Sequence, residues 1–423
     1  MFATVAAMAS PDLAPPAGRS PLSASERIDA LDVLRGVALL GIFVVNMATF
    51  GHSIFAPPAT EEWHTADGIV ASLRELLFAG KFNLMFGLVF GIGFTLQLRR
   101  LEVADAGGAA FVYVRRLTAL LGIGLVHAAF LWMGDVLVAY SVLGFGLLAL
   151  RRAPTALVVL LLAACLLYPA ASDVLSAQFF STRTAVIGQF RMGELAASND
   201  QAFGHGGFID AVRETMQTFA WAYTTPLGVY TVFSFFVQMG TGILLGFLVG
   251  RRGWISKLDA LRVPMRRAQL GALALALAAG SAWYVMGGNG GPDGSASFGS
   301  ALARTSGRAS LMAFYALTVL RLAVAPGTAR AMRIFAWPGR MPLTNYLLQT
   351  IMGLAIFYGW GLGWWDQTGA MTETALAFAL YIAVQIPLSA WWLSRFRYGP
   401  VEFVWRRVTY GTLKRSPSSS PTS

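Results

Sequence analysis

Charged residues, cysteines and histidines are all scarce in this chain of 423 residues. Asp, Glu, Lys and Arg make up 13% of it, against about 25% in ordinary soluble domains, while 56% of it is hydrophobic. These proportions exclude a soluble globular protein. Cys165 is the single cysteine, which excludes an intrachain disulfide and a cysteine-rich metal site. There are four histidines and no pair with HExxH spacing, so we expect no metal site and no firmly implied cofactor.

The hydrophobic residues are gathered into segments of the length that a bilayer requires. A hydrocarbon core of about 30 Å takes roughly 17 to 25 helical residues to cross. The sequence therefore predicts an all-α, polytopic transmembrane bundle of about ten spans. Their approximate limits are 31–50, 82–98, 117–133, 135–150, 154–174, 226–249, 268–286, 309–325, 342–360 and 374–393.

The net charge of +11 is distributed as a topology signal. With a cytoplasmic N-terminus, 25 of the 32 Lys and Arg residues fall in the inner connections and tails, as positively charged residues of membrane proteins do. This bias predicts that both termini are cytoplasmic. The basic residues flank the spans without forming a long basic face, so we expect a lipid bilayer as partner and no nucleic acid.

One integral membrane domain is predicted, at 27–411, between disordered cytoplasmic tails at 1–26 and 412–423. The long outer loop 175–225 has amphipathic stretches, which predict short helices packed over the outer mouth. The polar segment 69–81 is expected to lie along the interface with Lys81 reaching outward.

Glycines recur every fourth residue in two of the spans. Gly87 and Gly91 form one such stripe, and Gly242, Gly246 and Gly250 form another. Small residues at this spacing let a second helix backbone approach closely, so we expect both stripes to be packing surfaces.

Five segments, in this order and spacing, resemble the YeiB-like family of bacterial inner-membrane proteins, domain of unknown function family 418. The resemblance implies an integral protein of the bacterial inner membrane. The segments are LDVLRGVALLGIFVVN (Leu31 to Asn46), GKFNLMFGLVFGIGF (Gly80 to Phe94), RRLTALLGIGLVHAAFLWMGDVLVAYSVLG (Arg115 to Gly144), GRMPLTNYLLQT (Gly339 to Thr350) and FRYGPVEFVWRRVTYG (Phe396 to Gly411).

The opening LDxLRG, Leu31 to Gly36, also resembles the start of the wider membrane acyltransferase group, which includes the heparan-alpha-glucosaminide N-acetyltransferases. By resemblance, those enzymes move an acyl group from a cytoplasmic coenzyme A thioester to an acceptor on the far side. Some of them have a catalytic histidine near the outer end of the first span. The corresponding region here offers Asn46, His52 and His64.

The topology places all four histidines on or near the outer side. His127 is the strongest candidate for a general base, because it lies in an apolar span and Asp135 follows at the next turn. The carboxylate could fold back to hold one imidazole nitrogen and leave the other to accept a proton. The alternative is a structural histidine, with Asp135 as the helix cap of the fourth span. His64, in EEWHTAD, is a weaker candidate for a cavity residue, and a solvated loop is the better explanation of it.

Two arginines mark a candidate anion site on the inner side. Arg35 stands about one turn into the first span, where it would meet Asp32, an anionic ligand or lipid phosphate. Arg340 precedes Pro342, which suits a helix N-terminus with free N–H groups. We therefore expect Arg35 and Arg340 to hold the donor, acyl-CoA, with plain inside anchoring as the alternative.

Further polar residues are expected inside the bundle. They either line a cavity or bond neighbouring helices, and they are Asn46, Asn345, Tyr346 and Gln349.

Three functions remain open from the sequence. The first is an acyltransferase that moves an acyl group from cytoplasmic acyl-CoA to a lipid or glycan acceptor at the outer face, with His127 and Asp135 as catalytic residues. The second is a small-molecule or lipid transporter or flippase, although no convincing internal repeat supports it. The third is a non-catalytic membrane partner protein.

Overall fold

The structure is a computed structural model that describes residues 24–56, 64–104, 107–179, 182–258, 261–288 and 297–410. Within these ranges the regular structure is entirely helical. Residues 24–26 of the predicted N-terminal tail belong to the first helix. The rest of that tail and the tail predicted at 412–423 lie outside the described residues.

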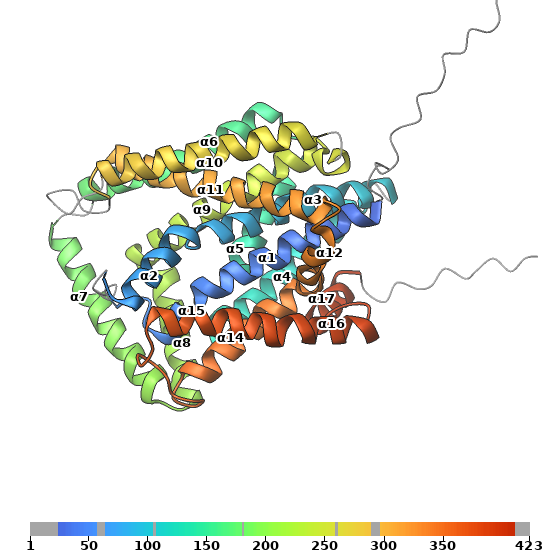
Figure 1. The fold of residues 1–423 in the computed structure, drawn as a ribbon. Helices are drawn as coiled ribbons and strands as arrows, with labels where there is room; N and C mark the ends of the chain where they lie inside the picture. Colours follow the sequence, from blue (N-terminus) through green and yellow to red (C-terminus); the bar gives the residue numbers. More distant parts are fainter. Residues whose placement is uncertain are drawn as a thin grey trace, which may run out of the picture.

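The chain forms a bundle of long helices, with shorter helices at its two ends (Figure 1). The long helices are α1 (Ala24–Gly51), α3 (Lys81–Ala104), α4 (Ala109–Phe130), α6 (Thr155–Phe179), α9 (Pro226–Arg251), α10 (Arg262–Val285) and α11 (Phe298–Val324). The shorter ones are α2 (Ala66–Leu77), α5 (Leu137–Ala149), α7 (Thr182–Asn199), α8 (Phe208–Thr224), α12 (Ala329–Met332), α13 (Ala336–Arg340), α14 (Pro342–Phe357), α15 (Ala370–Leu380), α16 (Ile386–Arg395) and α17 (Pro400–Tyr410).

Eight helical runs among the described residues are long and apolar enough to cross a membrane, which makes the chain a multi-pass membrane protein. Each coincides with one of the ten predicted spans. The other two predicted spans, 135–150 and 342–360, are helices α5 and α14, which have 13 and 16 residues and are shorter than a span requires by length alone. The count of ten therefore stays a prediction.

The two ends of the bundle differ in what covers them. The start of α1, in blue, and α17, in red, lie at one end, and α7 and α8 lie at the other (Figure 1). We call these the α17 end and the α7 end. The predicted orientation assigns the α17 end to the cytoplasm.

The glycine stripes form the contact between α3 and α9, as predicted. A Cβ added at Gly246 would stand 2.0 Å from the backbone oxygen of Leu88, and one at Gly242 would stand 2.2 Å from that of Leu84. On α3, a Cβ added at Gly91 would likewise stand 2.2 Å from the backbone oxygen of Ile243 in α9. Only glycine allows two backbones this close, so the stripes set the distance between the helices.

Helix α1 lies inside the bundle and is held by close backbone contacts at its α17 end. A Cβ at Gly36 would overlap the carbonyl of Phe335, and a Cβ at Gly339 would overlap that of Asp32. These contacts join α1 to α13 and its flanking turn. They also bring Asp32 and Arg35 of α1 next to the segment that carries Arg340.

A π-helical turn, Tyr381–Gln385, joins α15 to α16 just before Pro387. A proline cannot donate a backbone hydrogen bond, and a π-turn accommodates that loss. The turn places two polar side chains, Tyr381 and Gln385, in the interior, where Tyr381 donates to the Gly36 oxygen at 2.5 Å.

The prediction that Lys81 reaches outward is wrong. Its side chain is buried, and its ammonium donates to the Glu75 carbonyl at 2.6 Å. The bend between α2 and α3 turns that carbonyl inward, and the ammonium satisfies it.

Candidate functional site

His127 lies at the centre of a buried hydrogen-bonded series. Its Nδ1 is 2.7 Å from Oδ2 of Asp135, and its Nε2 is 2.9 Å from the hydroxyl of Thr350. A carboxylate can only accept, so Nδ1 carries a proton. In the tautomer with this single ring proton, Nε2 is the acceptor for the hydrogen bond from the Thr350 hydroxyl. We call Asp135, His127 and Thr350 the His127 network. It has the order of groups that activates a hydroxyl in acyl-transfer enzymes.

The carboxylate of Asp135 is held in place from two directions. Its second oxygen, Oδ1, accepts from the Val138 backbone N–H at 2.7 Å, at the start of α5. The neighbouring Val136 N–H donates to the Tyr346 hydroxyl at 3.3 Å. Both sequence interpretations of Asp135 therefore hold at once, because one oxygen orients the imidazole and the other caps a helix.

His127 lies in the last turn of α4, late in the third predicted span, as the sequence indicated. Thr350 is near the middle of α14, so His127 is about halfway along that helix. The turn after α4 is covered by aromatic residues, and Trp132 of this turn packs on Phe50 with ring centroids 4.7 Å apart. Residues from α7 to α8 and from the loop after α14 close over it.

The predicted polar residues of α14 bond neighbouring helices. Asn345 donates to Ser389 at 3.0 Å, and Gln349 donates to Gln385 at 3.0 Å and to the Leu39 oxygen at 3.3 Å. One acceptor in this layer, Gln349 Oε1, has no hydrogen-bond partner in the described part of the chain. Neither of the two pockets described below is lined by Asn345, Tyr346 or Gln349. The side-chain amides of Asn345 and Gln349 link α14 to neighbouring helices, among them α1, and to the π-turn. These hydrogen bonds fix the rotation of α14, the helix that carries Thr350.

The remaining two predicted cavity residues lie apart from the network. Asn46 is buried near the α7 end of α1, and His64 is exposed just before α2. Neither lines one of the two pockets.

The two predicted donor-binding arginines lie on one face of the α17 end. Arg35 pairs with Asp32 at 2.5 Å, and Arg340 is close enough to act electrostatically on the same carboxylate. Asp29 acts on this carboxylate as well, so two guanidinium groups and two carboxylates meet here.

The helix N-terminus beside Arg340 is not an open anion site. Glu402 of α17 is buried there, and its carboxylate accepts from the backbone N–H groups of Leu343 and Thr344 at 2.7 and 3.0 Å. Burial raises the pKa of Glu402, against these hydrogen bonds, which lower it. A protein carboxylate thus occupies the position that the sequence suggested for a phosphate.

An apolar groove of about 380 Å³ reaches the network from outside the bundle. Helices α4, α14 and α17 form its walls, and His127 is part of its lining. Gly122 lies on its floor, where an added Cβ would meet nothing within 4 Å.

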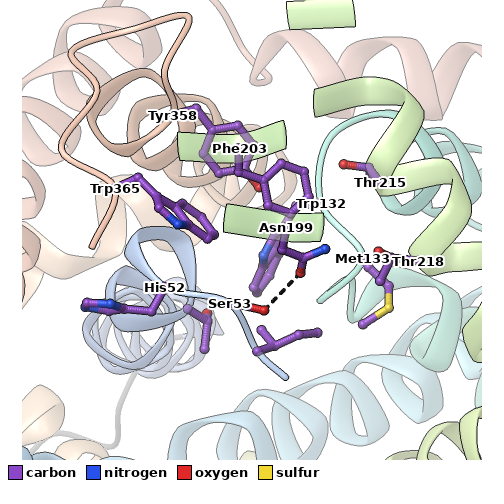
Figure 2. A pocket seen from close by; sticks show the side chains of 12 residues that line it. His52, Ser53, Trp132, Met133, Asn199, Phe203, Thr215, Thr218, Tyr358 and Trp365 are labelled. Carbon is purple, nitrogen blue, oxygen red and sulfur yellow. Dashed lines mark hydrogen bonds between the residues drawn. The ribbon is translucent and has the colours of Figure 1, made fainter. Parts of the chain in front are cut away.

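A second pocket, of about 20 Å³, lies at the α7 end above the turn after α4 (Figure 2). Aromatic rings surround it, and polar groups include the hydrogen bond from Ser53 to Asn199 at 3.1 Å. The buried hydroxyl of Thr218 has no hydrogen-bond partner in the described part of the chain. The space fits about one water molecule. The rings are those of Trp132, Phe203, Tyr358 and Trp365.

A cluster of ionic groups beside this pocket was missed from the sequence. His52 contacts Asp366 at 2.8 Å and Glu373 at 2.7 Å, and Glu373 also pairs with Arg74 at 2.6 Å. Each of these contacts joins two residues 299 to 321 positions apart along the chain, so no local spacing signals the cluster. The hydrogen bond to Glu373 raises the pKa of His52 to about 9. His52 is therefore a cation at neutral pH and closes the α7 end as part of an ion cluster.

This cluster predicts a pH-dependent stability. The pKa of His52 is raised from 6.5 to about 9, so its stabilising effect is complete below about pH 6.5 and is lost as the pH rises through about 9. We expect the thermal midpoint in detergent of the wild type to exceed that of His52→Gln at pH 6.5, and the difference to shrink by pH 10. His205→Gln, at an exposed position, should show no such convergence. A constant difference between wild type and His52→Gln would contradict this role.

Within the ranges described, no group of three or more His, Cys, Asp or Glu side chains could hold a metal ion.

The comparisons with known proteins give a family and no activity. Residues 249–412 match the family model described as "Protein of unknown function (DUF418)". The uncharacterized protein YxaH of Bacillus subtilis (strain 168) is 29% identical over 403 residues, which cover 92% of this chain and 96% of YxaH. The uncharacterized protein YeiB of Escherichia coli (strain K12) is 28% identical over 434 residues, which cover 94% of this chain and all of YeiB. No solved structure matches.

Proposed function

This chain is a YeiB-like membrane protein, and from that premise we propose that it is an acyltransferase of the bacterial inner membrane. It takes an acyl group from cytoplasmic acyl-CoA and delivers it to an acceptor at the outer face. The observation that carries this proposal is the His127 network, a hydroxyl, an imidazole and a carboxylate in hydrogen-bonded order halfway along α14.

The depth of Thr350 suits it to carry the acyl group. A donor at one face and an acceptor at the other are separated by a core of about 30 Å, so a direct attack requires one of them to cross the bundle. A hydroxyl near the middle of α14 lies between the two faces, so each of two transfers would cover only part of that distance. Thr350 therefore accepts the acyl group first and passes it on.

Each step uses atoms of the network. His127 Nε2 takes the proton from Thr350, the hydroxyl oxygen attacks the thioester carbonyl, and the carbon–sulfur bond breaks. The proton on Nε2 goes to the leaving thiolate. An acceptor hydroxyl or amine then attacks the threonine ester, His127 takes its proton, and the Thr350 oxygen leaves and recovers that proton. Asp135 holds the ring in the required tautomer throughout.

Arg35 and Arg340 serve the donor side in this proposal. Their guanidinium groups at the α17 end suit the phosphate groups of coenzyme A. The α7 end faces the acceptor in this proposal, since the turn that connects His127 to Asp135 lies at that end.

A transporter is less well supported by the same residues. Transport calls for a substrate-sized cavity between two halves of the bundle. Of the two pockets lined by described residues, one has about 20 Å³ and the other lies on the outside of the bundle. The polar residues of α14 bond other helices and do not line a pathway.

The proposal is tested by two substitutions at Thr350 in vesicles of bacterial lipid with acetyl-labelled acetyl-CoA. Thr350→Ser keeps the hydroxyl and should retain transfer of label to lipid, glycan or water. Thr350→Val keeps the shape and lacks the hydroxyl, so transfer should fall about 10²-fold or more. Both variants should elute as the wild type does in size-exclusion chromatography. Full turnover by Thr350→Val would exclude the threonine ester.

A further inference from the structure

We infer that the apolar groove holds one acyl chain of an anionic phospholipid, whose headgroup lies against arginines of α4 and α17. This site goes beyond the proposed function and does not depend on it.

The groove has the dimensions of a chain-binding site. Its lining on α4 extends from Ala119 to Leu131, about 18 Å at 1.5 Å per residue. Its volume of about 380 Å³ lies in the range of small-molecule sites, roughly 300–1,000 Å³. The open floor at Gly122 leaves room for a methylene chain against the helix backbone.

Helix α17 closes the groove at the α17 end and is bound firmly to α4. The Trp405 indole N–H donates to the Arg116 carbonyl at 2.9 Å, and the Arg115 guanidinium donates to the Val408 carbonyl at 2.7 Å. Val408 and Trp405 both line the groove. A chain in the groove therefore ends directly below this pair of arginines.

Four arginines at this rim have no carboxylate partner. The Arg116 guanidinium lies 3.7 Å from the centroid of a Trp405 ring, Arg406 lies 4.4 Å from that of Tyr398, and Arg407 lies 5.9 Å from that of Phe403. Neither these three nor Arg115 forms an ion pair with an acidic side chain in the described ranges. The buried carboxylate of α17, that of Glu402, is bound to the start of α14.

The positive rim and the apolar groove together select the occupant. Clustered arginines beside a span attract anionic lipids. Exposed Phe403 and Val404 give α17 the apolar face of a helix that lies in the interface. An anionic phospholipid fits both parts, since its phosphate meets the arginines and one chain enters the groove towards His127.

The test measures lipid binding to the purified full-length protein in detergent by native mass spectrometry and thermal unfolding. We expect one phosphatidylglycerol to remain bound per chain and to raise the thermal midpoint more than phosphatidylcholine does. Gly122→Trp fills the groove and should lower phosphatidylglycerol affinity about tenfold or more. Gly122→Leu is a milder filling variant, for use if the tryptophan variant unfolds.

Matched variants separate the two parts of the site. Gly271→Trp is the control, because Gly271 of α10 also has nothing within 4 Å of an added Cβ and should leave binding unchanged. Arg115→Gln combined with Arg407→Gln should abolish the preference for phosphatidylglycerol over phosphatidylcholine. Equal binding by Gly122→Trp and wild type would overturn the groove site, as would full stabilisation by glycerol phosphate without chains. Displacement by palmitoyl-CoA with no retained phosphatidylglycerol would assign the groove to a thioester instead.

Discussion

Replacement of His127 by glutamine is expected to lower acyl transfer by about 10²- to 10⁴-fold, the usual contribution of general-base catalysis. The amide of glutamine can reach Asp135 or Thr350, but it cannot accept a proton and release it again. The loss should appear in the rate constant for transfer more than in the concentration of acetyl-CoA at half-maximal rate. The measurement is label transferred per minute per folded protein in vesicles.

Two controls show that the loss is chemical. Asp135→Asn keeps the side-chain shape and should also reduce transfer, because an amide can donate to Nδ1 and favour the wrong tautomer. His205→Gln changes an exposed histidine outside the network and should retain near-normal transfer at pH 7. Transfer by His127→Gln at the wild-type rate would remove the imidazole from the mechanism.

Replacement of Gly246 by valine is expected to cause the largest loss of stability. Its Cβ would stand 2.0 Å from the Leu88 oxygen, and this neighbour is helix backbone that cannot move aside alone. Overpacking of this kind costs roughly 1–3 kcal/mol, and more where backbone must shift. We expect a lower thermal midpoint in detergent and a smaller folded fraction in size-exclusion chromatography.

The control for this variant is Gly271→Val, which introduces the same side chain into a helix of the same bundle. An added Cβ at Gly271 meets nothing within 4 Å, so only the small propensity difference between glycine and valine applies. Equal midpoints for the two variants would show that α3 and α9 do not depend on their close approach.

The sequence allowed those parts of the fold to be predicted that local patterns encode. Hydrophobic length located the helices, and spacing by four identified the facing glycines of α3 and α9. His127 and Asp135 are eight residues apart across one turn, so their contact could also be predicted. Gly246 shows the limit, because its stripe predicts a close partner without naming Leu88.

What could not be predicted depends on contacts between distant segments. Thr350 is 223 positions from His127, and no pattern in α14 separates it from other apolar-helix threonines. Glu402 reaches the start of α14 from a helix 58 residues later and fills the expected anion site.

The central claim is that Thr350 carries the acyl group, and the most direct measurement is its covalent labelling. Purified protein would be mixed with labelled acetyl-CoA for one turnover, quenched in acid, digested and analysed by mass spectrometry. The account predicts an acetyl ester at position 350, on threonine in the wild type and on serine in Thr350→Ser, and no ester there in Thr350→Val or His127→Gln. Two results would contradict it. One is steady transfer of label by the wild type with no ester on Thr350, and the other is steady transfer of label by Thr350→Val.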